Sequence, residues 1–458
     1  MKLPVIGLSD TPLTPSGFGK VARKMFMPLP QGLFRLAHLG RGYPGTCRYP
    51  GVQCYGYEGS GPREDTGQTA LPRVINDFAP DGPFALWTLM DPWQTSWIGT
   101  PKESPVAHPL STRYLTANRQ RMTWVGYFTC DAMGPRNGPP RWVEGYLDSC
   151  DVPVMMSEWA RKLCQPFCKK ELRFIPHGVS DTFHPDDQAA CRDEWDRKHF
   201  KATLKSLSRE MGEANPEALM AESHKSAFTL GDRFTVLSVM ANRERKYWPT
   251  LLKAFRMLVD KVPNARFIGV CGLHRTPDER GWDLPSICKD LGLRTFEEGQ
   301  SDPNVWLIGQ IGTRSVDEDD DVIRKLNAIA NVTAVISGGE GSGMPQLEAH
   351  ACGRPCVVGK YSASTEQVVD DREGVLPRGF MTVGQNESQR PLYRAEDIAD
   401  RFLYAYKNPG WCREVGAAGV EQAERLRWHK IIPQWVDVFT GVADRVMPQA
   451  EEAIATPA

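Results

Sequence analysis

Residues 337–359 have the sequence SGGEGSGMPQLEAHACGRPCVVG, which is the strongest structural signal in this chain. The pattern predicts a strand that ends in a glycine-rich loop, a helix that begins near Met344, and a second strand from Cys356. The backbone N–H groups at such a helix start, together with the helix dipole, favour oxygen-rich or anionic ligands. Because glycines let a ligand approach the backbone closely, the stretch predicts a ligand-binding loop in a parallel α/β sheet.

Two acids in this stretch are placed to contact different parts of one long polar ligand. Glu340 lies on the loop, and Glu348 lies about one turn into the predicted helix. Spacing alone leaves an alternative, which is an ordinary strand–helix connection with two incidental acids, because glycine-rich loops by themselves are weak signals.

The length of the chain, 458 residues, is too great for one compact core and favours two domains. Short apolar runs alternate with helical patterns in both halves, which is typical of parallel βαβ units. The predicted parts are a first domain over 1–178, a second domain over 179–425 with a helical insertion at about 186–228, a helix over 426–447 and a disordered tail over 448–458.

Composition excludes several classes of protein. Apolar residues make up 41% of the chain and charged residues 24%, as in an ordinary globular protein. No run of about 18 apolar residues is present, and the start, MKLPVIGLSD, lacks the features of a signal peptide, so we expect a cytoplasmic protein. Two cysteine pairs at CxxxC spacing lack the further ligands of a zinc site, and buried thiols are the favoured interpretation for Cys164, Cys168, Cys352 and Cys356.

The 337–359 stretch resembles the donor-site motif of glycosyltransferase family 4, in which an E-x7-E pair lies in a run similar to EGFGLPxLEAMAxGxPVV. Glu340 and Glu348 stand in that register, and the downstream stretch from Glu366 to Gly374 is similar to the continuation E-x-V-x-D-x-x-x-G. The resemblance implies the GT-B fold, in which two Rossmann-like domains face a cleft and the last helix crosses back.

The same resemblance implies roles for the residues of the motif. Glu348 is expected to hold the nucleotide ribose, and Glu340 is expected to hold sugar hydroxyls together with the amides that follow it. Those amides belong to Gly341, Ser342, Gly343 and Met344.

A basic pair lies in a second segment that is similar to this family, VLSVMANRERKYWPTLLKAFRML at 236–258. Arg245 and Lys246 occupy the positions that the family uses beside the donor diphosphate, and Arg243 is a further candidate. Met240 and Ala241 stand where the family more often has Gly-Arg, so the phosphate contact rests on Arg245 and Lys246. An alternative, two solvated cations at a helix start, conflicts with the helix dipole.

Two segments of the first domain extend the resemblance. TPSGFGKVARKM at 14–25 resembles a glycine-rich loop that closes over the donor phosphates, with Gly17 and Gly19 opening the next helix. A bare G-x-G is a weak signal, and its position after the first strand is what supports it. Residues 157–187 resemble the bridge into the donor domain, with His177 in place of the usual Asn, and we interpret His177 as a turn residue.

The chain departs from the family near the expected reacting centre. Many relatives carry a His there, whereas the matching stretch VGYFTCDAMGP contains Asp131 and no His. Asp131 either approaches the acceptor hydroxyl or caps the turn before Pro135, since acids are common in turns.

The resemblance implies a retaining, hexosyltransferase-like enzyme that transfers a sugar from a nucleotide-diphosphate sugar to an acceptor hydroxyl, with no cofactor and no metal. The alternatives are a sugar-nucleotide epimerase or hydrolase of the same fold, and an inactive sugar-nucleotide-binding protein. The acceptor is a glycan, a small molecule or a hydroxylated base in DNA. The sequence leaves open which of these it is, the donor base and sugar, and the oligomeric state.

Charge is unevenly distributed along the chain, and this bears on the acceptor. Residues 1–180 contain 20 Lys/Arg and 14 Asp/Glu, while the rest of the chain has an acidic surplus. The basic surplus favours an anionic acceptor, either DNA or a lipid-linked glycan, and the alternative is a scattered solvated surface. The basic groups are Arg113, Arg119, Arg121, Arg161, Lys162, Lys169, Lys170 and Arg173.

Overall fold

The computed structural model describes residues 2–14, 16–43, 49–57, 66–99, 109–144, 146–211, 227–271, 281–296, 301–309, 316–384 and 387–447. The predicted tail and residues 212–226 of the predicted insertion lie outside the described residues. The chain forms two compact units. Unit 1 contains the described residues of Met1–Cys130, Arg136–Gly178 and Trp428–Ala458, and unit 2 contains those of Asp131–Pro135 and Val179–Arg427.

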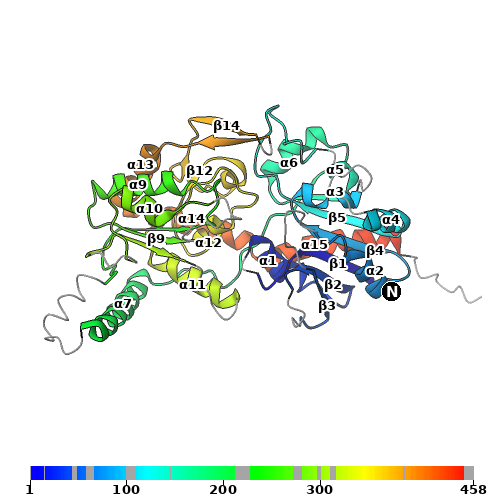
Figure 1. The fold of residues 1–458 in the computed structure, drawn as a ribbon, viewed down its shortest axis with the longest axis horizontal. Helices are drawn as coiled ribbons and strands as arrows, with labels where there is room; N and C mark the ends of the chain where they lie inside the picture. The colour runs from blue at the N-terminus through cyan, green and yellow to red at the C-terminus, as the bar shows by residue number, and fades with distance from the viewer. Residues whose placement is uncertain are drawn as a thin grey trace, which may run out of the picture. The chain divides into compact units, whose positions relative to one another are not determined.

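Unit 1 is built on a parallel sheet of seven strands in the order β3-β2-β1-β4-β5-β6-β7 (Figure 1). The strands are β1 (Leu3–Asp10), β2 (Phe34–Arg41), β3 (Val52–Tyr57), β4 (Phe84–Leu89), β5 (Met122–Phe128), β6 (Val152–Met155) and β7 (Arg173–Phe174). β4 has the sequence FALWTL and is buried along its whole length, as expected of a central strand whose two faces are both covered. Strand β3 was not predicted from the sequence.

Helices cover both faces of the unit 1 sheet. They are α1 (Gly17–Val21), the π-helix η1 (Ala22–Phe26), α2 (Leu71–Phe78), α3 (Pro92–Gly99), α4 (Pro109–Asn118), α5 (Tyr146–Ser149), α6 (Glu158–Cys164), the 3₁₀ helix η2 (Gln165–Phe167) and α15 (Trp428–Val446). The last helix, α15, returns to unit 1, where the Trp435 ring lies 4.7 Å from that of Tyr127 and 6.1 Å from that of Trp87. Aromatic burial of this size dominates core energetics, so α15 is part of the core of unit 1.

Unit 2 contains a parallel sheet of six strands in the order β10-β9-β8-β11-β12-β13 and a separate antiparallel hairpin, β14–β15. The strands are β8 (Thr235–Val239), β9 (Arg266–Val270), β10 (Val305–Ile308), β11 (Val332–Val335), β12 (Cys356–Gly359), β13 (Gly374–Val375), β14 (Gly379–Val383) and β15 (Ser388–Leu392). The hairpin was not predicted from the sequence.

Two helical layers enclose the unit 2 sheet, one on each face (Figure 1). On β8, Val236 belongs to the core beneath one layer and Leu237 to the core beneath the other, which follows from the alternation of side chains along a strand. The helices are α7 (Gln188–Met211), α9 (Trp248–Val259), α10 (Leu284–Asp290), α11 (Val316–Ile329), α12 (Met344–Ala351), the 3₁₀ helix η3 (Ser362–Glu366), α13 (Ala395–Lys407) and α14 (Pro409–Arg425).

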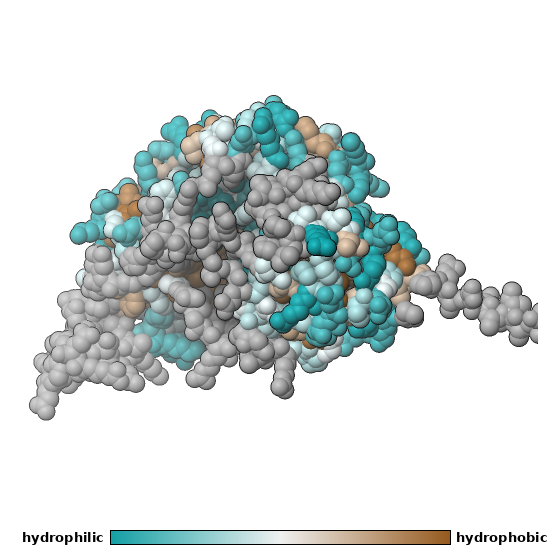
Figure 2. Space-filling model, turned by 45° about the vertical axis from the view of Figure 1, so that its right-hand side comes forward, coloured by the Kyte–Doolittle hydropathy of each residue, from teal (hydrophilic) through white to brown (hydrophobic). Residues whose placement is uncertain are grey.

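The described helices include none that is long and apolar enough to span a membrane. On the face drawn in Figure 2, the hydrophobic residues of the described surface are scattered among hydrophilic ones.

Candidate active site

Two loops of unit 2 meet where the neighbouring strands β8 and β11 end. Because these strands are parallel, their carboxyl ends lie at the same edge of the sheet, which is where α/β folds bind ligands. One loop leads from β8 to α9 and carries Arg245 and Lys246, and the other leads from β11 to α12 and carries Glu340. The Gly338 N–H donates to the Arg245 carbonyl at 2.6 Å, and the Tyr247 N–H donates to the Ile336 carbonyl at 3.1 Å. The backbone therefore joins the two loops.

Lys246 and Glu340 form an ion pair between these loops. Lys246 Nζ donates to Glu340 Oε1, and both residues are only 7% exposed. Burial lowers the pKa of Lys246 to about 8 in spite of the carboxylate beside it. Burial alone would raise the pKa of Glu340, but Lys246 and Arg245 outweigh it and hold that pKa below its usual value. At neutral pH the pair is therefore an ammonium and a carboxylate.

Arg245 is the more exposed cation of the two, with 36% of its side chain accessible. Its Nη1 donates to the Gly339 carbonyl and, at 3.4 Å, to Ser337 Oγ. The same nitrogen lies 3.7 Å from Asp131 Oδ2 and 3.9 Å from Glu340 Oε1. The guanidinium is thus held over the start of the glycine-rich loop while part of it faces solvent.

Asp131 belongs to this cluster because residues 131–135 pack within unit 2. Arg390, on β15, donates from Nη1 to Asp131 Oδ1 at 3.1 Å. Burial alone would raise the pKa of Asp131, but Arg390 and Arg245 lower it. Arg390 was not among the site residues predicted from the sequence, because no motif around it provides a signal. The two interpretations left open for Asp131, acceptor contact or turn cap, did not include this ion pair.

The glycine-rich loop leaves backbone N–H groups available at the start of α12. Gly343 has a φ of 76°, a left-handed conformation that favours glycine, and Pro345 follows in the first turn. Within the described part of the chain, no protein acceptor pairs with the N–H groups of Gly341, Ser342 or Met344. Unpaired N–H groups at a helix start are the usual partners of anions and hydroxyl oxygens.

The body of α12 is anchored behind this loop. Glu348, the predicted ribose contact, lies in the helix with 6% of its surface exposed. Two residues on, His350 Nε2 lies 2.9 Å from Glu373 Oε1, and both side chains are fully buried. The same Glu373 oxygen accepts the Cys356 N–H at 2.7 Å, so this carboxylate joins α12 to β12.

Gly17 and Gly19, the two predicted site glycines of unit 1, lie at a helix start whose N–H groups are bonded differently from those of α12. α1 begins at Gly17, and the N–H of Gly19 donates to Ser16 Oγ at 3.0 Å, while Ser16 Oγ donates to Asp10 Oδ2 at 2.7 Å. A methyl group at Gly19 would lie 2.5 Å from the Thr14 carbonyl oxygen. The N-terminal turn of α1 is therefore capped from within the protein, and Gly19 is required by close backbone packing.

His177 lies in the core of unit 1 and has the character of a structural residue. Its ring packs edge-on against Tyr127 at 5.4 Å, and burial lowers its pKa to about 3.

The cysteines at CxxxC spacing, which are Cys164, Cys168, Cys352 and Cys356, are free thiols. Among the described residues, no group of three or more His, Cys, Asp or Glu side chains is arranged to hold a metal ion.

Several of the basic side chains of unit 1 make contacts inside the protein. Arg161 pairs with Glu158 at 2.6 Å, Arg119 pairs with Asp151 at 2.7 Å, and Lys170 Nζ donates to the Cys150 carbonyl at 2.6 Å.

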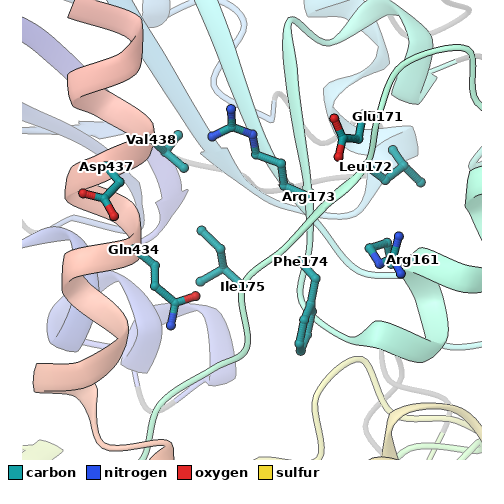
Figure 3. A pocket seen from close by; sticks show the side chains of 9 residues that line it. All are labelled: Arg161, Glu171, Leu172, Arg173, Phe174, Ile175, Gln434, Asp437 and Val438. Atoms are coloured by element: carbon teal, nitrogen blue, oxygen red, sulfur yellow. The ribbon is translucent and has the colours of Figure 1, made fainter.

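An open pocket of about 380 Å³ lies between the segment containing β7 and α15 (Figure 3). Its lining mixes both signs of charge and consists of Arg161, Glu171, Leu172, Arg173, Phe174, Ile175, Gln434, Asp437 and Val438.

The chain is similar to known proteins in both sequence and fold. No protein family model matches the chain. A curated relative, the D-inositol 3-phosphate glycosyltransferase of Mycobacteroides abscessus, is 28% identical over 204 residues, which are 43% of this chain and 39% of the relative. The chain therefore matches about two fifths of that relative's length.

Solved structures are similar over nearly the whole chain. The sucrose-phosphate synthase of Thermosynechococcus elongatus superimposes with a TM-score of 0.66 at 15% identity, covering 97% of this chain and all of the other. The fold is GT-B. The α,α-trehalose 6-phosphate synthase of Burkholderia multivorans shares it, with a TM-score of 0.60 at 13% identity over 97% of this chain and 99% of the synthase. These likenesses confirm the predicted fold class.

Proposed function

We propose that this chain is a glycosyltransferase that moves a sugar from a nucleotide-diphosphate sugar to an acceptor hydroxyl. The observation that carries the proposal is the convergence of Arg245, Lys246 and Glu340 at the edge of the unit 2 sheet, beside the open amides before α12. Cations and unpaired N–H groups suit a diphosphate, and a carboxylate suits sugar hydroxyls. The sequence similarity to a curated glycosyltransferase supports the same conclusion.

The proposed reaction breaks the bond between the anomeric carbon and a diphosphate oxygen. A bond forms between that carbon and the acceptor oxygen, and the acceptor proton passes to the departing diphosphate. Negative charge grows on the diphosphate as the bond breaks, and Arg245 and Lys246 stabilise it in a setting that needs little reorganisation. We propose retention of configuration, as the family resemblance implies. Because the leaving diphosphate takes the acceptor proton, this course does not require a glycosidase-type pair of carboxylates.

The two acids of the motif have separate proposed roles. Glu340 orients the sugar through its hydroxyls while its carboxylate remains paired with Lys246. Glu348, further along α12, holds the ribose. We also propose that the reaction needs no divalent metal, because Arg245 and Lys246 supply the positive charge, and turnover that persists in excess EDTA would support this.

The acceptor we propose is an anionic compound that carries a hydroxyl group. The basic surplus before residue 180 supports this, although some of those side chains are engaged inside the protein. The names of the relatives above include phosphorylated sugars or polyols, which makes a phosphorylated small molecule the first class to test. Duplex DNA with hydroxylated bases and a lipid-linked glycan are the other classes.

The experiment is a matrix of donors and acceptors. The purified chain is incubated with UDP-, GDP- and ADP-sugars, each with and without sugar phosphates, inositol phosphates, hydroxymethylated duplex DNA or a lipid-linked glycan. Release of nucleoside diphosphate that depends on an acceptor, with a glycosylated product in the mass spectrum, is the expected result. Full turnover of a donor without any acceptor would indicate an epimerase or hydrolase, and binding without release would indicate an inactive binding protein.

A further inference from the structure

Arg390 makes three contacts from one nitrogen, and all of them lie in the candidate site. The residue is on β15, and its side chain is only 9% exposed. Nη1 donates to Asp131 Oδ1 at 3.1 Å, to the Asp131 carbonyl at 3.4 Å and to the Gly338 carbonyl at 3.0 Å. Through Gly338, Arg390 contacts the glycine-rich loop itself.

The backbone around Asp131 is held tightly against the same loop. The Gln389 N–H donates to the Met133 carbonyl at 2.7 Å, and the Met133 N–H donates to Tyr361 Oη at 2.7 Å. A methyl group at Gly339 would lie 1.9 Å from the Asp131 carbonyl oxygen, so that position has no room for a side chain. The Asp131 carboxylate therefore has a fixed place beside Arg245.

This arrangement sets up a competition for Arg245. The carboxylate of Asp131 lies 3.7 Å from the Arg245 guanidinium, which the proposed donor diphosphate also requires. Arg390, bound to the other oxygen of Asp131, compensates the charge of that carboxylate. The cluster of Arg245, Lys246, Arg390, Asp131 and Glu340 has three cations and two carboxylates, and without Arg390 the charges would balance and the attraction for a diphosphate would fall.

We infer that Arg390 is a positioning residue of the donor site, which shares the charge of Asp131 and so weakens the attraction of that carboxylate for Arg245, the proposed ligand of the diphosphate. This inference rests on the proposed function. It assigns Asp131 the role of a fixed counter-ion that does not itself exchange protons with the acceptor.

The test measures nucleoside diphosphate binding by titration calorimetry, with UDP and GDP as probes. Arg390→Gln should weaken binding by about tenfold or more, because the Asp131 carboxylate, no longer compensated, then attracts Arg245 more strongly. Asp131→Asn should leave binding equal or tighter. The double variant Arg390→Gln/Asp131→Asn should recover most of the wild-type affinity, since the competing carboxylate is gone.

The matched control lies at the base of the same hairpin. Arg378 forms an exposed two-pronged ion pair with Asp397, with distances of 2.6 and 2.7 Å, and has no described contact with the site residues. Arg378→Gln, alone or with Asp397→Asn, should leave binding unchanged. Thermal unfolding of each variant checks folding, and Arg390→Met, which also removes the charge, with and without Asp131→Asn allows the same comparison if Arg390→Gln is not folded.

Two results would overturn the inference. If the double variant bound as weakly as Arg390→Gln, Arg390 would act only by supporting the hairpin. If Arg390→Gln bound like the wild type, Asp131 would not compete for Arg245. Failure of the wild type to bind either nucleoside diphosphate is a different outcome, because it contradicts the proposed function and with it the inference.

Discussion

The glycine-rich loops of the two units share a sequence pattern but differ in structure. Each follows a strand and begins a helix, α1 in unit 1 and α12 in unit 2. In unit 1, Ser16 caps the N–H of Gly19, and close backbone oxygens explain the glycine. In unit 2, the N–H groups of Gly341, Ser342 and Met344 have no described protein partner, and Glu340, which precedes them, forms ion pairs with Lys246 and Arg245. Glycine spacing thus indicates a tight turn, and the groups around the turn decide whether it suits a ligand.

The largest effect is expected when the two cations beside the unit 2 loop are substituted. Lys246→Ala and Arg245→Ala should each reduce turnover far more than donor binding, by about 2–4 kcal/mol, or a factor of ~10²–10³. The charge that these cations meet is greatest in the transition state. Steady-state kinetics at saturating donor provides the measurement, with Lys253→Ala on the exposed side of α9 as the control. Near-normal turnover in both variants would mean that the diphosphate lies elsewhere.

The two acids of the unit 2 loop should differ in the parameter that they change. Glu348→Ala should mainly raise the donor KM, because a ribose contact is equally strong in the ground and transition states. Glu340→Ala should mainly lower kcat, because it orients the anomeric carbon. Steady-state constants for both variants test this split, and the opposite pattern would contradict the assigned register.

The pH dependence of kcat/KM tests the role of Lys246 beside the unit 2 loop. Its pKa is lowered to about 8, so the protonated fraction falls as the pH rises through that value. We expect kcat/KM to fall on the alkaline side, about tenfold for each pH unit well above 8 if only the ammonium form is active. Lys246→Arg should move this limb to higher pH, because a guanidinium stays protonated. An unchanged alkaline limb in that variant would assign it to another group.

The smallest effects are expected from the unit 1 loop. Ser16→Ala should lower stability by about 0.5–2 kcal/mol, as for loss of a helix cap. Gly19→Ala should cost about 1–3 kcal/mol, because the added methyl meets a backbone oxygen at 2.5 Å. Denaturant unfolding gives both values. Nucleoside diphosphate affinity, measured while the variants are folded, shows whether Gly17 and Gly19 form a phosphate site, as the resemblance implies, or a structural turn.

Much of the fold followed from local sequence patterns. The helix that begins at Met344 and the strand that begins at Cys356 were both predicted from the glycine-rich stretch. Helix and strand periods are properties of neighbouring residues, and the two motifs, one with Glu340 and one with Arg245 and Lys246, are each local as well. The strand Val52–Tyr57 and the β14–β15 hairpin escaped prediction, because short strands carry a weak periodic signal.

Only the tertiary structure brought Asp131 together with Arg390. They are 259 residues apart in the chain, and no period or motif links them. Their pairing depends on residues 131–135 packing in unit 2 and on the hairpin that presents Arg390. The sequence by itself determined the loop, its glycines and the charges along it. The fold decided which of those charges face one another, because that depends on contacts between segments far apart in the chain.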